Sequence, residues 1–214
     1  DPAHYRGQRR FIFQQRFGIG QVATQRRPGE QDGHHREAAE IAEHADEAIV
    51  VLKSTVVPGT CDKINNLYPG LNLVFSPEFL TEKNSVNDFK KCNRVIFSGN
   101  ESDTLKCEIA FKKVFPNKEY LRTDWKTAEM VKYFLNTFLA TKVSFANEIH
   151  QVCDSLHIDY NKMLELALYD ERINKTHFLV PGPDGDYGFG GTCFPKDINA
   201  LINLCNTEDI DCSI

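Results

Sequence analysis

The sequence predicts an α/β fold in which a partial parallel sheet precedes an all-helical domain with one long helix. Two apolar runs, at residues 48–52 and 71–75, have the length of buried strands, and a helical stretch at 61–67 separates them. Strand, helix and strand in this order indicate a right-handed parallel unit. After residue 124, about 30 residues keep apolar side chains at helical spacing without glycine or proline, which predicts a single long helix.

Composition limits the class of protein. The chain has 214 residues, of which 41% are hydrophobic, and this is enough for one or two small domains with a buried core. The net charge of -5 argues against non-specific nucleic-acid binding, and no apolar stretch is long enough for a membrane span or a signal peptide. We therefore expect a cytoplasmic protein without a nucleic-acid or membrane partner.

The cysteines and histidines predict no metal centre. The seven cysteines are odd in number and contain no Cys-x-x-Cys pair, which indicates reduced thiols and no zinc site. His34 and His35 lie in a polar stretch, where solvated side chains are more common than metal ligands.

Residues 1–36 differ in composition from the rest of the chain. Before Lys53 every basic residue other than histidine is arginine, and neither lysine nor asparagine occurs, whereas both are frequent afterwards. A single domain rarely changes its residue usage so sharply. Our hypothesis is that residues 1–36 are a misframed or misjoined segment. Resequencing the gene across this junction tests it, because one intact frame would count against it.

A short glycine pattern lies within this anomalous segment. Residues 18–23, Gly-Ile-Gly-Gln-Val-Ala, fit the Gly-x-Gly-x-x-Ala form of the dinucleotide fingerprint. A genuine fingerprint follows a buried strand and opens an amphipathic helix, but polar residues 14–16 precede this pattern and residues 26–29, Arg-Arg-Pro-Gly, follow it. We therefore do not assign a dinucleotide site to it.

Residues 37–123 are predicted to form a sheet with helices. Residues 37–45 are predicted to be helical, and residues 94–97 supply a third candidate strand. Thr55 and Glu78 each follow one of the first two strands. Because ligands of parallel sheets gather at the carboxyl ends of the strands, both residues are candidates for a site. The plainer interpretation of either side chain is a helix cap.

The long helix is predicted to begin after an N-cap pair, Thr123 and Asp124, and to extend about 45 Å. A small domain does not need this length for its own core, so we expect the helix to pack against a partner. Lys132 and Asn136 share one face of the helix, as do Glu129 and Lys132. The alternative for this face is a solvated surface with an ordinary ion pair.

Further along the chain, Asp159 is predicted to cap a second helix that extends to Leu168. The loop at residues 180–186 is rich in proline and glycine and is predicted to be shaped and extended. Arg172 lies between these elements, where an arginine is more often a surface charge than a ligand contact.

Residues 188–197, Gly-Phe-Gly-Gly-Thr-Cys-Phe-Pro-Lys-Asp, form a glycine-rich turn that leads into a helix. Pro195 suits the first helical position, and apolar residues follow at helical spacing. Cys193 therefore lies at or beside the N-cap, where unpaired amides, the helix dipole and Lys196 favour a thiolate. The glycines, which include Gly190, remove side chains where a ligand would approach closely. The alternative is a tight turn beside an inert thiol.

The decapeptide at residues 188–197 resembles the active-site signature of the UDP-glucose/GDP-mannose dehydrogenases. Four further segments resemble motifs of that family in the family's order: the Lys-Ser-Thr loop, the Pro-Glu-Phe-Leu segment, the central helix and the Asp-x-Arg-Ile element, at residues 53–60, 76–82, 128–139 and 170–173. The resemblance covers the chain from residue 37 to the C-terminus.

This resemblance implies a domain organisation. Residues 37–123 would be the C-terminal part of a Rossmann-like NAD-binding domain, and residues 124–214 the helical central dimerisation domain that carries the catalytic cysteine. The first half of the cofactor domain and the C-terminal UDP-binding domain of the family are expected to be absent from this chain.

The resemblance also implies an activity: the NAD-dependent oxidation of UDP-glucose at C6 to UDP-glucuronate, through a cysteine thiohemiacetal and thioester, in a homodimer. Catalytic roles would fall to Cys193, Lys132, Asn136, Asp197, Glu78 and Thr55. Substrate contacts would come from Glu78, Lys132, Asn136, Arg172 and Gly190, and NAD contacts from Thr55, Glu82 and Lys196. Two alternatives stay open: a catalytically inactive helical dimerisation module, and a dehydrogenase of GDP-mannose or UDP-N-acetylmannosamine.

Overall fold

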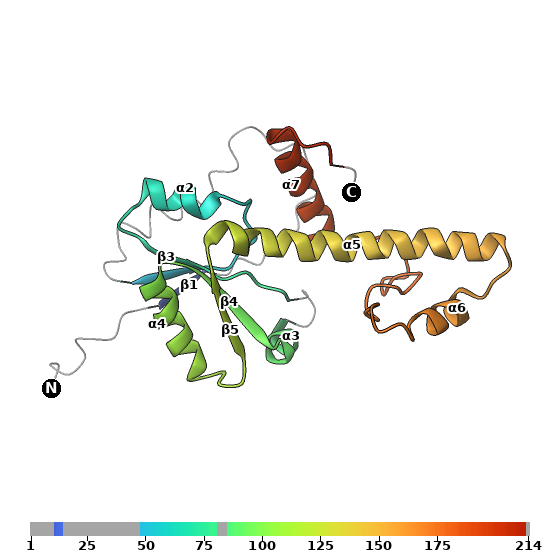
Figure 1. Cartoon of the computed structure of the whole chain (residues 1–214), viewed down its shortest axis with the longest axis horizontal. Helices are drawn as coiled ribbons and strands as arrows, with labels where there is room; N and C mark the ends of the chain where they lie inside the picture. The colour runs from blue at the N-terminus through green and yellow to red at the C-terminus, as the bar shows by residue number, and fades with distance from the viewer. Residues whose placement is uncertain (1–10, 15–47, 81–84, 213–214) are drawn as a thin grey trace. The chain divides into compact units, whose positions relative to one another are not determined.

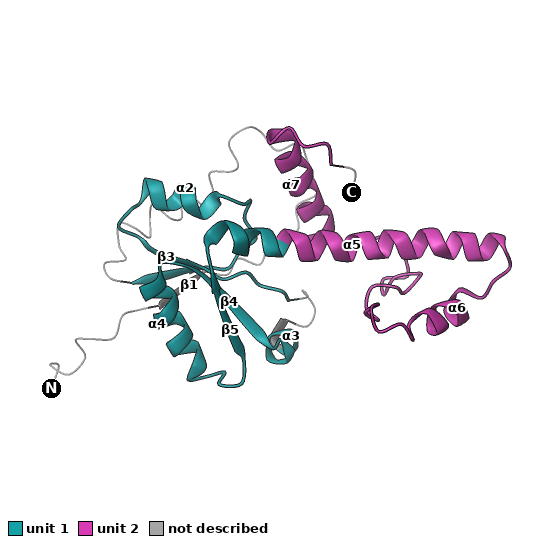
Figure 2. Ribbon diagram, in the orientation of Figure 1, with its two compact units in different colours: residues 1–132 teal, residues 133–214 magenta. Residues whose placement is uncertain are grey.

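The structure is a computed structural model that describes residues 11–14, 48–80 and 85–212. The chain divides into two compact units, residues 1–132 (unit 1) and residues 133–214 (unit 2) (Figure 2). The elements in chain order are β1 (Phe11–Gln14), β2 (Ile49–Leu52), α2 (Thr60–Leu67), β3 (Asn72–Phe75), α3 (Ser85–Lys91), β4 (Arg94–Gly99), α4 (Glu101–Lys112), β5 (Glu119–Thr123), α5 (Trp125–Ser155), α6 (Tyr160–Ala167) and α7 (Cys193–Thr207) (Figure 1).

Unit 1 is built on a five-stranded sheet with the strand order β1-β2-β3-β4-β5. The predicted unit of strand, helix and strand is confirmed, because β2 and β3 are adjacent and parallel and α2 connects them. β4 runs antiparallel to β3, so the sheet is mixed, with three parallel strand pairs and one antiparallel pair. The apolar run at 94–97 marks a strand but not its direction, since side chains alternate between the faces in the same way in both directions.

Several elements of unit 1 were not predicted. β5 is an edge strand that pairs in parallel with β4, and three of its five side chains are exposed, so it lacks the apolar run of a buried strand. β1 pairs in parallel with β2, although it lies within residues 1–36. The misjoined origin of that segment stays a prediction. The glycine pattern at 18–23 and the helix predicted at 37–45 lie outside the described residues.

Alternating side chains of the strands build two apolar layers, one on each face of the sheet. On one face, Val50, Leu73 and Phe75 pack with residues of α2 and with Ala128 of α5. On the other face, Val51 and its neighbours pack with Cys107 of α4. α2 and α4 accordingly lie on opposite sides of the sheet (Figure 1).

α5 confirms the prediction of one long helix, since its 31 residues correspond to about 46 Å. Asp124 is its N-cap: Oδ1 accepts a hydrogen bond of 2.9 Å from the Thr127 backbone N–H, and Oδ2 accepts one of 2.6 Å from the Thr127 hydroxyl. These hydrogen bonds lower the pKa of Asp124. The units divide within α5, after Lys132, because the first turns of the helix pack on the sheet through Ala128.

The described part of unit 2 is helical. Asp159 caps α6 as predicted, with its Oδ1 accepting a hydrogen bond of 3.1 Å from the Lys162 N–H. A small core joins α5, α6 and the segment that follows α6, and its buried members are Ala146, Cys153, Tyr160 and Val180.

Candidate active site

The glycine turn places Cys193 at the first residue of α7, with Thr192 at the N-cap. The thiol is exposed. The prediction that Pro195 starts the helix is wrong by two residues, because the helix begins at Cys193 and Pro195 is its third residue. A proline is tolerated there since the first-turn N–H groups have no acceptor within the helix. Gly188 and Gly191 have φ angles of 79° and 76°, in the left-handed region that favours glycine over other residues.

Asp197 lies one helical turn after Cys193 and is almost completely buried, with 1% of its surface exposed. Its Oδ2 accepts a hydrogen bond of 2.5 Å from Asn136 Nδ2 on α5. Its Oδ1 contacts the ammonium group of Lys196, a side chain that is half exposed. The structure thus brings together three predicted site residues, and a buried carboxylate with two donors connects α7 to α5.

Lys132 lies one helical turn before Asn136 on α5, and both side chains are buried. The Lys132 ammonium lies 5.6 Å from the centre of the Phe79 ring, which belongs to the segment after β3. The buried position argues against the alternative of a solvated helix face.

Glu129 has a role that the sequence did not reveal. Its side chain is completely buried, and its carboxylate accepts hydrogen bonds of 2.5 Å from the Gly59 N–H and 2.9 Å from the Cys61 N–H. These amides belong to the N-terminus of α2, where a negative charge is favourable. Burial raises the pKa of Glu129, and the hydrogen bonds from Cys61 and Gly59 partly oppose this rise. Glu129 therefore attaches α5 to α2.

Thr55 and Glu78 lie just beyond the carboxyl ends of β2 and β3. Because these strands are parallel neighbours, both residues belong to the same edge of the sheet, as predicted. The Glu78 Oε1 atom lies 3.6 Å from the Lys53 ammonium, so a partly buried ion pair lines this edge.

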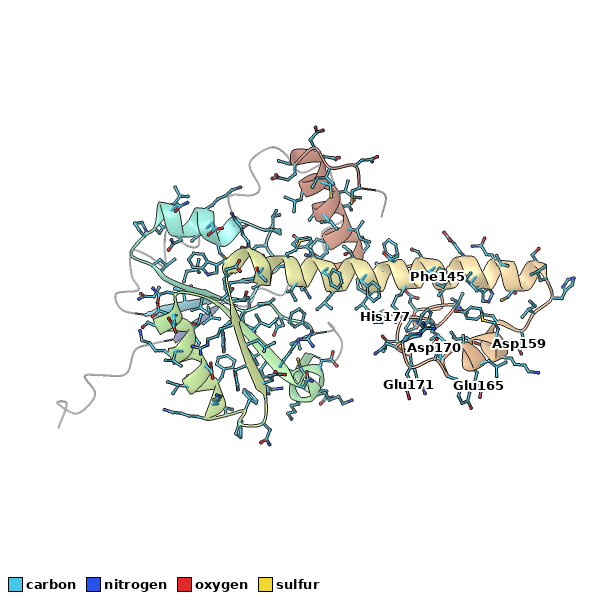
Figure 3. The ribbon with its side chains drawn as sticks, viewed as in Figure 1. Phe145, Asp159, Glu165, Asp170, Glu171 and His177 are labelled. Carbon is cyan, nitrogen blue, oxygen red and sulfur yellow. The ribbon has the colours of Figure 1, made fainter. Side chains whose placement is uncertain are left out.

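The remaining predicted residues lie in exposed segments or outside the described part of the chain. Arg172 is 88% exposed, and its Nε lies 2.9 Å from Asp170 Oδ1. Figure 3 shows Asp170 beside Glu171 in the segment that follows α6. Gly190 is exposed, and a Cβ atom added there would meet Asp184 at an ordinary contact distance of 3.6 Å. Glu82 lies outside the described residues.

The predicted residues fall into both compact units. Thr55, Glu78 and Lys132 belong to unit 1, and the residues of unit 2 are Asn136, Arg172, Gly190, Cys193, Lys196 and Asp197. Asn147 was not among the predicted residues; it is a buried amide on α5 whose Oδ1 accepts a hydrogen bond of 2.9 Å from the Gly188 N–H. A signal was present, because Asn147 lies eleven residues after Asn136, which is three helical turns on the same face.

A hollow of about 510 Å³ lies elsewhere in unit 1. It is lined by Asp62, Asn65, Gly99, Asn100, Asp124, Trp125 and Lys126. Gly99 pairs with Val74 in the antiparallel ladder, so its end of β4 lies away from the edge that carries Thr55 and Glu78. The predicted chemistry therefore does not use this hollow.

Comparisons with known proteins give a consistent picture. A family model described as the UDP-glucose/GDP-mannose dehydrogenase family, NAD binding domain, matches residues 29–117, and the central domain of the same family matches residues 126–214. A UDP-glucose 6-dehydrogenase of Rickettsia prowazekii is 37% identical over 174 residues, which are 78% of this chain and 39% of that protein.

Two solved structures with the same fold are also named as dehydrogenases of nucleotide sugars. A UDP-glucose dehydrogenase from Pyrobaculum islandicum is 34% identical with a TM-score of 0.66, over 76% of this chain and 38% of its own. A UDP-D-ManNAc dehydrogenase from Pyrococcus horikoshii is 27% identical with a TM-score of 0.67, over 80% of this chain and 42% of its own. The chain spans about two fifths of the length of these relatives. Within the described part of the chain, no helix is both long and apolar enough to cross a membrane.

Proposed function

Because the chain belongs to the UDP-glucose/GDP-mannose dehydrogenase family, we propose that it carries catalytic residues of an NAD-dependent dehydrogenase that oxidises UDP-glucose at C6 to UDP-glucuronate. The observation that carries this proposal is the environment of Cys193. An exposed thiol stands at the first position of α7, and a buried carboxylate, Asp197, lies one turn further and binds Asn136. This is the arrangement expected of a nucleophile with a fixed acid–base group beside it.

The edge of the sheet fits a dinucleotide. β2 and β3 are parallel neighbours, and binding sites for dinucleotides form beyond the carboxyl ends of such strands. Thr55 follows β2 there, and Thr55, Glu82 and Lys196 are the residues proposed to hold NAD. When bound, NAD accepts the hydride in each of the two oxidations.

In the first oxidation, C6 of the sugar loses a hydride and its hydroxyl loses a proton, which leaves an aldehyde. The Lys132 ammonium stabilises the negative charge that develops on the oxygen. Asn136 adds a neutral donor, since its amide nitrogen carries two hydrogens and only one is used by Asp197. Glu78 and Asp197 are the carboxylates that receive protons, through a water that Thr55 orients.

In the second oxidation, Cys193 Sγ adds to the aldehyde carbon, and the carbonyl oxygen takes up a proton to give a thiohemiacetal. The same carbon then loses a hydride and the hydroxyl loses its proton, which leaves a thioester. Water attacks the thioester carbon, Asp197 or Glu78 takes up the proton of that water, and the C–S bond breaks. The products are the sugar carboxylate and the regenerated thiol.

Substrate recognition is proposed for Arg172, Gly190 and the loop at 181–188. The guanidinium of Arg172, which is exposed and paired with Asp170, is proposed to reach the substrate of a neighbouring subunit. The loop would read the ring substituents of the sugar. The structure from Pyrococcus horikoshii is named for UDP-D-ManNAc, and this supports a second candidate substrate beside UDP-glucose.

We propose a homodimer with α5 at its centre. Phe134, Phe138 and Phe145 are large apolar side chains on α5 that are 63%, 54% and 55% exposed. The rings of Phe134 and Phe138 stack with their centres 6.1 Å apart, so these two side chains form one apolar patch. A second copy of the chain would cover it. The same surface favours the alternative of a helical dimerisation module without catalysis.

A cytoplasmic location is in keeping with seven cysteines that are all free.

One experiment separates these functions. The chain is mixed with NAD and UDP-glucose, GDP-mannose or UDP-N-acetylmannosamine, and NADH absorbance is followed beside a size-exclusion profile. NADH formation with UDP-glucose, accompanied by UDP-glucuronate that Cys193→Ser does not make and Cys92→Ser still makes, supports the dehydrogenase. A dimer that forms no NADH with any of these sugars favours the module.

A further inference from the structure

The glycine turn before Cys193 has little restraint of its own. Three of the four residues from 188 to 191 are glycines, and glycine loses more conformational freedom on ordering than any other residue. A turn of this composition needs an external anchor if the residue that follows it is to keep one position.

Asn147 supplies such an anchor on α5. Its Oδ1 accepts a hydrogen bond of 2.9 Å from the Gly188 N–H, and its Nδ2 donates one of 2.8 Å to the Val143 carbonyl one turn earlier in the helix. Asn147 is 8% exposed, so its carboxamide is largely shielded from water. The two bonds fix the orientation of the carboxamide, because a flipped amide would place its nitrogen against the Gly188 N–H and its oxygen against the Val143 carbonyl.

The residue before Gly188 is attached to the same face of the helix. The Tyr187 ring meets the His150 ring edge-on, with the ring centres 6.0 Å apart. His150 lies three residues after Asn147, so the two side chains are neighbours on α5. Earlier in the same segment, the Asn174 carbonyl accepts a hydrogen bond of 3.0 Å from Lys142 Nζ on α5. In Figure 3 this segment, on which His177 is labelled, runs alongside α5.

The other end of the turn is held by the same helix. Asp197 in the first turns of α7 accepts the hydrogen bond from Asn136. Asn136 and Asn147 are separated by eleven residues, which is about three helical turns and about 16 Å along the axis. α5 therefore contacts the chain on both sides of Cys193 through two buried amides on one face.

We propose that Asn147 is a positioning residue for Cys193: it docks the glycine turn on α5 and, together with the contact between Asn136 and Asp197, holds the thiol at the N-terminus of α7. This inference rests on the proposed role of Cys193 as the nucleophile. Without the bond to Asn147 the turn relaxes, and Cys193 Sγ is no longer held in one position beside the N-terminal amides of α7.

The test is the alkylation rate of Cys193 by iodoacetamide in the full chain, read by peptide mass spectrometry. Cys92, which is partly exposed and lies in unit 1, is the internal reference. Asn147→Ala is expected to slow alkylation of Cys193 by about threefold to tenfold with Cys92 unchanged. Glu148→Ala, an exposed neighbour on α5, is the matched control and is expected to leave both rates unchanged. An unchanged Cys193 rate in folded Asn147→Ala overturns the proposal.

A second measurement applies if Asn147→Ala does not fold. Hydrogen exchange of the unmodified chain reports the Gly188 amide, which is expected to be protected by its bond to Asn147. Exchange at the rate of a free amide overturns the docking. Neither measurement needs NAD or a sugar. A chain that makes no NADH but shows slower alkylation in Asn147→Ala therefore contradicts the proposed function and supports the positioning role, and the reverse result contradicts the positioning role alone.

Discussion

The two compact units bury their apolar side chains to different extents. Unit 1 packs both faces of its sheet, with Phe75 and Phe97 completely buried in separate layers. The core described in unit 2 is one small cluster, whereas Phe134, Phe138 and Phe145 of α5 are exposed. Unit 1 therefore encloses apolar cores on both faces of its sheet, whereas unit 2 leaves large apolar side chains of α5 exposed.

The largest effect is expected from charges placed on the exposed apolar side chains of α5. The double variant Phe134→Glu/Phe138→Glu removes apolar area and places carboxylates in a symmetric contact, so association should weaken by at least about 4 kcal/mol, or a thousandfold. Size exclusion or analytical ultracentrifugation checks this. Val114→Glu, at a 68% exposed position of unit 1, should leave the oligomeric state unchanged. Equal elution of all three proteins would remove the case for a dimer through this face.

The next effect concerns the core of unit 1. Phe97 is completely buried and meets the Phe111 ring edge-on at 5.1 Å. Phe97→Ala leaves a cavity, and we expect the free energy of unfolding to fall by about 3–5 kcal/mol in denaturant titrations. Leu67→Ala, at a 61% exposed position, should change it by no more than about 0.5 kcal/mol. If the two variants were equally stable, unit 1 would not have the packed core described above.

A smaller effect on the free energy of unfolding is expected from Glu129, which joins α5 to α2. Burial raises its pKa above the ordinary value of 4.5, so the folded state binds this proton more tightly than the unfolded state. The contribution of the carboxyl group to stability is then fully present below pH 4.5 and is lost as the pH rises through the raised pKa.

The expected result is a pH-dependent difference between two proteins. As the pH rises from about 4 to 7, the free energy of unfolding of the unmodified chain should fall relative to that of Glu129→Gln, which cannot titrate. Glu148→Gln, an exposed position on the same helix, serves as the control. A constant difference across this range would contradict the raised pKa.

The sequence predicted the parts of the fold that depend on local patterns. The buried strands β2 and β3, the helix between them, α5 and the caps at Asp124 and Asp159 all follow from apolar spacing or capping chemistry. The direction of β4 did not follow, because strand patterning is the same in both directions. β5 escaped prediction because an exposed edge strand has no apolar run.

In the candidate site, too, the residues in local motifs were predicted and the contacts between distant elements were not. Cys193 and Asp197 were identified from a local motif, and their places on α7 agree with it to within two residues. The bond between Asn147 and Gly188 joins residues 41 positions apart, and the attachment of Glu129 to α2 joins residues about 70 apart. Such contacts depend on how the elements pack: the spacing from Asn136 places Asn147 on the same face of α5, but no local pattern identifies its partner in the turn.

The most direct test of the central claim, that Cys193 is the nucleophile, is the stoichiometry of NADH and UDP-glucuronate in a reaction of limiting UDP-glucose with excess NAD. The unmodified chain should form two NADH for each UDP-glucuronate, and Cys193→Ser should form no UDP-glucuronate, because the thiohemiacetal cannot form. UDP-glucuronate made by Cys193→Ser at the rate of the unmodified chain would contradict the claim.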